Sequence, residues 1–180
     1  ELFGHEKGAF TPAMRPKFGR GGQAADGVIF PHRFGDMSLF VVGFVLLCNL
    51  IVAAWSNAVN LTDGLDGLAA GLLAICFTVF AAIAYISGRV DFSDYLNIIY
   101  LPGAGELTIF SAAMAGACIG YLWFNSPPAE VFMGDTGSLS TGAALGTLAV
   151  LLKKELLLFI IGGVFVWEAI SVMIQKIGRA

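Results

Sequence analysis

The chain has 180 residues, of which 57% are hydrophobic and only 13% are charged, and its formal net charge is −3. Soluble domains are usually about 25% charged and about 45–50% apolar, whereas the mean hydropathy here is +0.81. These values exclude an ordinary soluble domain, a disordered protein and a nucleic-acid-binding protein, and they predict an integral membrane protein built of helices. The three cysteines each lie inside an apolar run, which is typical of buried thiols rather than of a disulfide framework or a zinc site.

The first 38 residues differ from the rest of the chain. They hold five of the ten lysines and arginines and both histidines, and they show no sustained apolar period, so we expect a soluble extension. From Leu39 onward, long charge-free stretches alternate with short polar segments. A membrane helix needs roughly 20 apolar residues. The pattern therefore predicts an all-α, polytopic membrane bundle of about five transmembrane helices, at 39–56, 68–87, 107–125, 139–152 and 156–175.

Counting membrane crossings places two polar loops on the same side of the membrane. These are the loop after the first predicted helix, 57–67, and the loop after the third, 126–138. The connection 88–106 and the turn at Lys153 belong to the other side. Because unusual polar residues collect in the two same-side loops, we expect a functional site where these loops meet.

The first polar loop carries four polar residues at intervals of three, and these are Asn57, Asn60, Asp63 and Asp66. In an α-helix this spacing spreads them over about half of the circumference. They could face one ligand only if the helix tightens or breaks at the intervening glycines. An interfacial turn would have a similar composition, and that alternative stays open. Ionisable residues at the ends of membrane helices are nevertheless costly unless they serve a site or a pathway.

The second polar loop follows a helix that Pro127 and Pro128 must stop, and it carries Asp135 between two glycines. Asp135 could cap a helix that starts near Ser138, or it could face a ligand. Carboxylates and carboxamides that converge from two loops suit a hard cation such as Mg²⁺, which binds oxygen ligands and substrate phosphates. Such an ion would let an acidic site hold a phosphorylated substrate.

At these residues the sequence resembles a known family. Segments 57–69 (NAVNLTDGLDGLA) and 131–139 (VFMGDTGSL) are similar to signature segments of the bacterial phospho-N-acetylmuramoyl-pentapeptide transferases. That family belongs to the polyprenyl-phosphate N-acetylhexosamine-1-phosphate transferases. The resemblance extends from about Leu39 to about Gln175 and includes WFNSPPAEVF (123–132) and GGVFVWEAISVMIQ (162–175).

The resemblance implies transfer of phospho-N-acetylmuramoyl-pentapeptide from its UDP carrier to undecaprenyl phosphate, which gives lipid I of peptidoglycan synthesis. It implies Mg²⁺ as the cofactor, and UDP-N-acetylmuramoyl-pentapeptide, undecaprenyl phosphate and membrane lipid as partners. We expect a multi-pass protein of the bacterial inner membrane with its site on the cytoplasmic face, and no nucleic-acid partner. A homodimer and a related N-acetylglucosamine-1-phosphate transferase both stay open.

The resemblance also assigns roles to residues. Asp135 would ligate Mg²⁺, with Asn60 as a second ligand, and Asp63 would line the catalytic centre beside Asp135. The uridine pocket would be formed by Gly64, Leu65, Asp66, Asn125 and Phe132. In that pocket the Phe132 ring could stack on uracil, and the Asn125 amide could offer hydrogen bonds.

Several features depart from the family pattern. The family carries an adjacent aspartate pair and a histidine-rich segment, whereas this chain has no adjacent aspartates and only His5 and His32. We therefore expect residues 39–180 to be a truncated transferase core, and a catalytically inactive membrane fragment is an open alternative.

Residues 1–38 resemble a degraded AAA+ segment of enhancer-dependent transcription activators. Most lysines and arginines lie on the side opposite the two loops, so the positive-inside rule by itself would place the loops outside the cell. We nevertheless expect the loops in the cytoplasm, because UDP-sugars are cytosolic.

Overall fold

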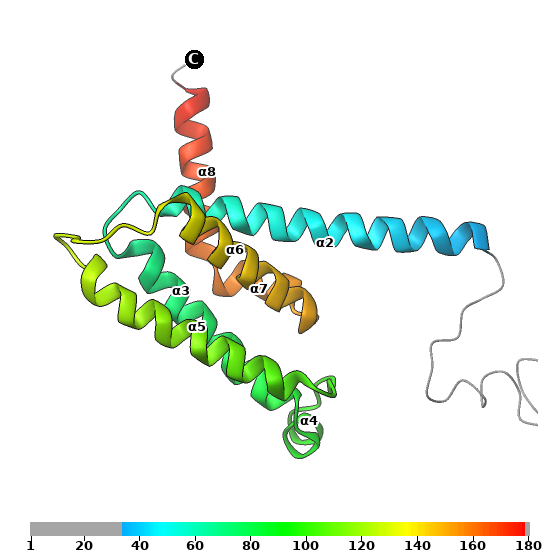
Figure 1. Ribbon diagram of the computed structural model, residues 1–180. Coiled ribbons are helices and arrows are strands. Elements are labelled where there is room, and N and C mark those ends of the chain that lie inside the picture. The colour runs from blue at the N-terminus through cyan, green and yellow to red at the C-terminus, as the bar shows by residue number, and fades with distance from the viewer. Residues whose placement is uncertain (1–33, 179–180) are drawn as a thin grey trace, which may run out of the picture. The chain divides into compact units, whose positions relative to one another are not determined.

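The structure is a computed structural model that describes residues 34–178 (Figure 1). Most of the AAA+-like segment therefore lies outside the described residues. The chain divides into two compact units, of which the first ends at Phe44 and the second begins at Val45. Both polar loops belong to the second unit. All secondary structure in the described part is helical, which confirms the predicted all-α fold.

The helices of residues 34–178 follow one another with short connections. In chain order they are α2 (Phe34–Thr62), α3 (Leu68–Ser87), α4 (Val90–Leu96), α5 (Ala104–Asn125), α6 (Gly134–Leu151), α7 (Glu155–Ile161) and α8 (Gly163–Ile177). The short helix α4 lies within the predicted connection 88–106. The second unit contains α2 from Val45 onward and all the helices after it.

Three helices of the described part are long and apolar enough to cross a membrane, and they are α2 from Leu39, α3 and α5. The helices α7 and α8 pass the same test only as a pair, with a bend of 76° between them. Residues 34–178 therefore form a polytopic helical membrane fold with three candidate spans, or four if the bent pair counts as one. Our prediction of about five was too high, because the first turns of α6 are polar and glycine-rich.

Two predicted helix boundaries were wrong for a common reason. The helix α2 continues to Thr62 instead of ending at residue 56, and α6 begins at Gly134 instead of 139. Polar side chains at these ends bond to the backbone of their own helix. The Asn57 amide donates to the Ala53 carbonyl at 2.8 Å, and the Thr62 hydroxyl donates to a carbonyl one turn earlier. Charge-free stretches therefore mark the membrane spans better than they mark the helix ends.

Close packing of α6 on α2 brings the two polar loops together. A Cβ atom at Gly142 would lie 2.7 Å from the Trp55 carbonyl oxygen, and one at Gly146 would lie 3.2 Å from the Val52 Cα atom. Small residues one helical turn apart allow two membrane helices to approach closely in this way. The Ser56 hydroxyl adds a 2.8 Å hydrogen bond to a carbonyl of α6. The start of α6 is consequently held beside the end of α2.

The break between α7 and α8 is packed around Trp55. A Cβ atom at Gly162 would lie 2.5 Å from the Trp55 ring, so only glycine leaves room there. The indole makes edge-to-face contacts with Phe159 and Phe165, at centroid separations of 5.7 and 6.4 Å. The predicted single helix 156–175 is thus two helices, and the double glycine at 162–163 marks the bend.

Candidate functional site

The first polar loop is shorter than predicted and begins where α2 ends. The Asp63 amide donates to the Val59 carbonyl at 3.1 Å and also to the Asn60 carbonyl at 3.3 Å, which closes the last turn of α2. The chain then turns through residues 63–67. Gly67 has a left-handed φ of 76° directly before α3, a conformation that favours glycine. The helix therefore breaks at the glycines, which is one of the two conditions under which the four polar residues could face one ligand.

The second polar loop leads into α6 with Asp135 in the first helical turn. The residue at the N-cap position is Met133, and no side chain caps this helix end. The alternative in which Asp135 caps a helix is therefore wrong. A carboxylate in the first turn is instead favoured by the helix dipole, and the Asp135 side chain is exposed.

The two loops meet at one end of the second unit. The Gly67 amide donates to Asn125 Oδ1 at 3.0 Å, and the Ala129 amide donates to Asp66 Oδ2 at 3.1 Å. These two hydrogen bonds join segments that are far apart in the sequence. They confirm the prediction that both loops lie on the same side.

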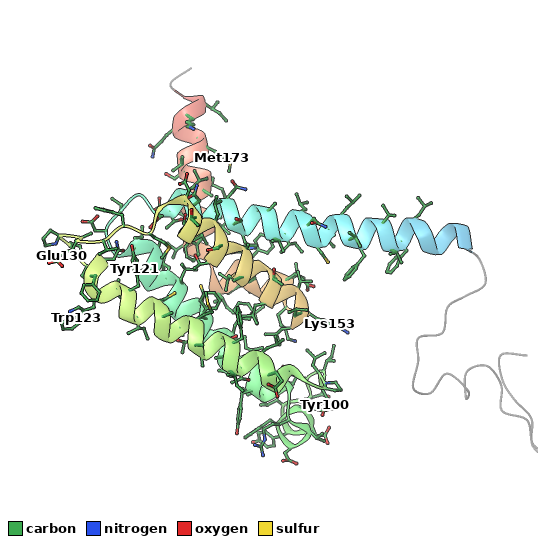
Figure 2. All side chains as sticks on the ribbon, in the orientation of Figure 1. Tyr100, Tyr121, Trp123, Glu130, Lys153 and Met173 are labelled. Atoms are coloured by element: carbon green, nitrogen blue, oxygen red, sulfur yellow. The ribbon has the colours of Figure 1, made fainter. Side chains whose placement is uncertain are left out.

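Labelled side chains show which end of the bundle this is (Figure 2). Tyr121, Trp123 and Glu130 lie at the end of α5 that leads into the second loop, and Tyr100 and Lys153 lie at the opposite end. The Tyr121 hydroxyl donates to the Val131 carbonyl at 3.1 Å, which holds the loop against α5. We refer to these two regions as the site end and the opposite end.

A third contact connects the helix termini of the site end. The fully buried Ser138 hydroxyl donates to Asn60 Oδ1 at 2.6 Å. It ties the first turn of α6 to the last turn of α2. Sequence analysis missed Ser138 as a site residue, although its position three residues after Asp135 puts both in neighbouring helical turns.

The carboxyl group of Asp63 senses the charge of Asp135 on the other loop. The pKa of Asp63 is raised above its ordinary value, first by partial burial and second by the negative charge of Asp135. A nearby negative charge disfavours the charged form of a carboxyl group, and burial does the same. The described ion pair of Arg89 with Asp91 lies away from them, beside α4. A divalent cation at the site end would relieve the repulsion between the two carboxylates.

Two side chains of this region carry oxygen atoms that could hold Mg²⁺. The described residues contain no group of three His, Cys, Asp or Glu side chains that could hold a metal ion by themselves. Mg²⁺ usually takes only one or two carboxylates and completes its shell with water and substrate phosphates. Asp135 is exposed, and Asn60 Oδ1 keeps a second lone pair beyond its bond from Ser138.

The residues assigned to a uridine pocket fall into two groups. Gly64, Leu65 and Phe132 are exposed, and the Leu65 and Phe132 side chains are 66% and 71% accessible. They are free to contact a ligand from two different loops. Asp66 and Asn125 instead use their side chains in the loop contacts, and Asn125 is only 4% accessible.

Residues 19–153 match the model of glycosyl transferase family 4. The chain belongs to this family. The family 4 match begins inside the predicted extension, and the domain boundary at Leu39 stays a prediction.

Three relatives carry one name, phospho-N-acetylmuramoyl-pentapeptide-transferase. The protein from Chloroherpeton thalassium is 60% identical over 135 residues, which are 75% of this chain and 37% of that protein. The proteins from Thermodesulfovibrio yellowstonii and Neisseria gonorrhoeae are each 55% identical. Those alignments cover 78% and 77% of this chain, and 38% and 39% of the relatives. The family 4 chain thus spans less than two fifths of the length of these curated relatives.

Proposed function

We propose that this family 4 chain carries the metal-binding and donor-binding loops of a phospho-N-acetylmuramoyl-pentapeptide transferase. The observation that supports this most is 55–60% identity to three proteins of that name over 135 to 140 residues. The substrates would be UDP-N-acetylmuramoyl-pentapeptide and undecaprenyl phosphate, and the products lipid I and UMP. A nucleotide donor is cytosolic, so the site end would face the cytoplasm from the inner membrane.

The reaction exchanges one phosphorus–oxygen bond for another. An oxygen of undecaprenyl phosphate bonds to the phosphorus that carries the sugar, and the bond from that phosphorus to the UMP oxygen breaks. Phosphoryl transfer of this kind depends on positioning and on neutralising phosphate charge. Bound Mg²⁺ would supply that neutralisation. Asp135 and Asn60 would hold the ion, while Asp63 would line the reaction centre.

The exposed residues of both loops suit the donor. Phe132 presents an aromatic face on which a uracil ring can stack, and Leu65 presents apolar surface from the other loop. A donor bound between the two loops would have its diphosphate near the carboxylates, because Asp63 and Asp135 lie within a few residues of these positions in the sequence.

An apolar groove suits the hydrocarbon chain of the acceptor. It has a volume of about 300 Å³ and lies between α2, α7 and α8, with Trp55, Leu61 and Met173 among its lining residues. Asn57 and Leu61 mark its end near the site. A lipid chain in this groove would bring its phosphate to the loop that carries Asp63.

The test is a radiolabelled transfer assay in vesicles that contain the protein, undecaprenyl phosphate and Mg²⁺. We expect label to enter lipid from UDP-N-acetylmuramoyl-pentapeptide and not from UDP-N-acetylglucosamine. Asp135→Asn should abolish this transfer while circular dichroism shows an unchanged helix content. Undiminished transfer by that variant would remove Asp135 from the metal site, and transfer from UDP-N-acetylglucosamine would assign the other substrate class.

A further inference from the structure

Ser138 lies near the start of α6 and is completely buried. Its hydroxyl oxygen lies 2.6 Å from Asn60 Oδ1, 3.0 Å from the Gly134 carbonyl oxygen and 3.4 Å from that of Asp135. A bond back to a carbonyl one turn earlier is usual for a serine in a helix. A hydroxyl has only one hydrogen to donate, and here the nearest acceptor belongs to another helix.

Asn60 behaves differently from the other two asparagines of α2. The amides of Asn49 and Asn57 donate to carbonyls four residues earlier in the same helix, both at 2.8 Å. The half-buried Asn60 instead turns its oxygen to Ser138, which is 78 positions away in the sequence. Its conformation is therefore set by a contact between two helices and not by α2 itself.

The surroundings of Ser138 fix it in this position. The Ser56 hydroxyl, one turn before Asn60, donates to the Leu139 carbonyl at 2.8 Å. A Cβ atom at Gly142, one turn after Ser138, would lie 2.8 Å from the Ser56 Cα atom. The two helix backbones are thus in contact one turn from the bond between Ser138 and Asn60, which leaves the hydroxyl little freedom to move.

An amide oxygen that is fixed in this way suits metal binding. The Asn60 oxygen accepts one hydrogen from Ser138 and keeps a second lone pair. Metal ligands are commonly oriented by hydrogen bonds from neighbouring residues, and loss of such a bond lowers metal affinity about 10–100-fold. Ser138 lies three residues after Asp135. One short segment therefore carries a carboxylate together with the group that orients a second oxygen ligand.

We propose that Ser138 is a positioning residue that holds the Asn60 side-chain oxygen in place for a divalent cation bound with Asp135. The inference rests on the proposed function, which assigns Asn60 and Asp135 as the ligands. Without the hydroxyl, the Asn60 amide is free to rotate and to bond to its own helix, as the Asn57 amide does. The cation would then lose its second protein ligand for much of the time.

Binding of Mn²⁺ tests the role of Ser138 without any turnover. The full chain in detergent micelles is titrated with Mn²⁺ in the absence of substrates, and free Mn²⁺ is measured by electron paramagnetic resonance. We expect Ser138→Ala to bind Mn²⁺ about tenfold more weakly than the wild type does. Equal affinities of the two proteins would overturn the positioning role.

Ser140→Ala is the matched control. Ser140 is an exposed serine of the same helix, and its hydroxyl donates to the Gly137 carbonyl at 3.0 Å within α6. It contacts no ligand, so its Mn²⁺ affinity should stay within about twofold of the wild type. A loss equal to that of Ser138→Ala would show that any serine of this helix has the effect, and would overturn the assignment.

A double variant separates positioning from a merely structural role. If Ser138 acts through Asn60, Ser138→Ala should change the Mn²⁺ affinity by less than about twofold once Asn60→Ala is present, because nothing remains to be oriented. A serine that only helps α6 to pack on α2 would weaken binding by the same factor with or without Asn60. That second result would overturn the proposal.

The Asn60 side-chain amide reports on the same contact in the wild type, so the test does not depend on how well a variant folds. With isotope-labelled asparagine, the side-chain signal that disappears in Asn60→Ala belongs to Asn60, and that of Asn97 is assigned in the same way. Bound Mn²⁺ should broaden the Asn60 signal beyond detection and leave the signal of Asn97, which follows α4 at the opposite end. Loss of both signals, or of neither, would overturn the proposal.

Label transfer distinguishes this proposal from the proposed function. If the wild type transfers no label while the Mn²⁺ affinities change as expected, the proposed function fails and the role of Ser138 stands. If label is transferred but Ser138→Ala binds Mn²⁺ as tightly as the wild type does, the role of Ser138 fails and the proposed function stands.

Discussion

The site end and the opposite end of the bundle are held together by different kinds of contact. At the site end, the hydrogen bonds of Gly67 and Ala129 to side chains join residues 58 and 63 positions apart, and the Ser138–Asn60 bond spans 78. At the opposite end, the Ser93 hydroxyl bonds to carbonyls only four to seven residues away.

This difference explains where substitutions should act on function. The hydrogen bonds of the opposite end join nearby residues, and the Leu101 amide reaches the Ser87 carbonyl only 14 positions away. The site end exists only when three separate segments dock in register, since its hydrogen bonds belong to distant parts of the chain. A change that displaces one helix should therefore disturb the site end even when it lies outside the loops.

Gly142→Val should produce the largest effect. The new side chain would meet the α2 backbone at 2.7 Å and 2.8 Å, so α6 must move away from α2. Overpacking of this kind costs about 2–3 kcal/mol, and it also separates Ser138 from Asn60. Unfolding in detergent with increasing dodecyl sulfate measures the loss of stability.

Gly116→Val is the control for this prediction. Gly116 lies on α5, and a Cβ atom there meets nothing within 4 Å. A substitution in that open space should change stability by less than about 0.5 kcal/mol. If both variants lost the same stability, the loss would come from placing valine in a helix and not from a tight α2–α6 contact.

Gly67→Ala and Gly103→Ala separate backbone strain from loop docking. Both glycines have a left-handed φ, 76° and 82°, but a Cβ atom meets neighbouring atoms only at Gly67. Each variant should lose about 1–2 kcal/mol of stability from strain. Only Gly67→Ala should also accelerate amide exchange at Ala129, because Gly103 lies at the opposite end. Faster exchange at Ala129 in Gly103→Ala would contradict the independence of the two ends.

The sequence predicted the elements of this fold better than their contacts. Apolar stretches free of charge located α3 and α5 within a few residues, and crossing counts placed the two loops on one side. The hydrogen bonds between the loops could not be predicted, because nothing in the residue pattern shows that the Asn125 side chain accepts the Gly67 amide. In the sequence, the tight α2–α6 contact corresponds only to two glycines one helical turn apart, Gly142 and Gly146. The bend at Gly162 depends on the Trp55 ring, which belongs to another helix.

Asp63→Asn should give a smaller, pH-dependent gain in stability. The folded-state pKa of Asp63 is raised above 3.8, so the folded protein binds this proton more tightly than the unfolded chain does. The free energy of unfolding therefore falls as the pH rises from 3.8 through the folded-state pKa. The variant lacks this penalty, so it should be more stable than the wild type at pH 7. The difference should vanish below about pH 4, near the unfolded pKa of an aspartate.

This measurement is made in EDTA, since a bound cation would remove the repulsion that destabilises the wild type. Asp91→Asn serves as the comparison at the opposite end, where the carboxylate pairs with Arg89 at 3.8 Å. Losing an exposed pair does not stabilise the protein. A pH-independent gain in Asp63→Asn would show that the pKa of Asp63 is not raised in the folded state.

Arg89→Ala should have the smallest effect. The guanidinium lies 5.5 Å from the Tyr85 ring centroid and 5.6 Å from that of Phe92, and it pairs with Asp91. Exposed cation–π contacts and surface ion pairs each contribute about 0–1 kcal/mol, so the total loss should stay near 1 kcal/mol. All three partners lie within four residues of Arg89 along the chain, so the disturbance should remain local. Amide exchange at Gly67 and Ala129 should therefore be unchanged, and a rise there would show that the opposite end transmits strain along α3 to the two polar loops.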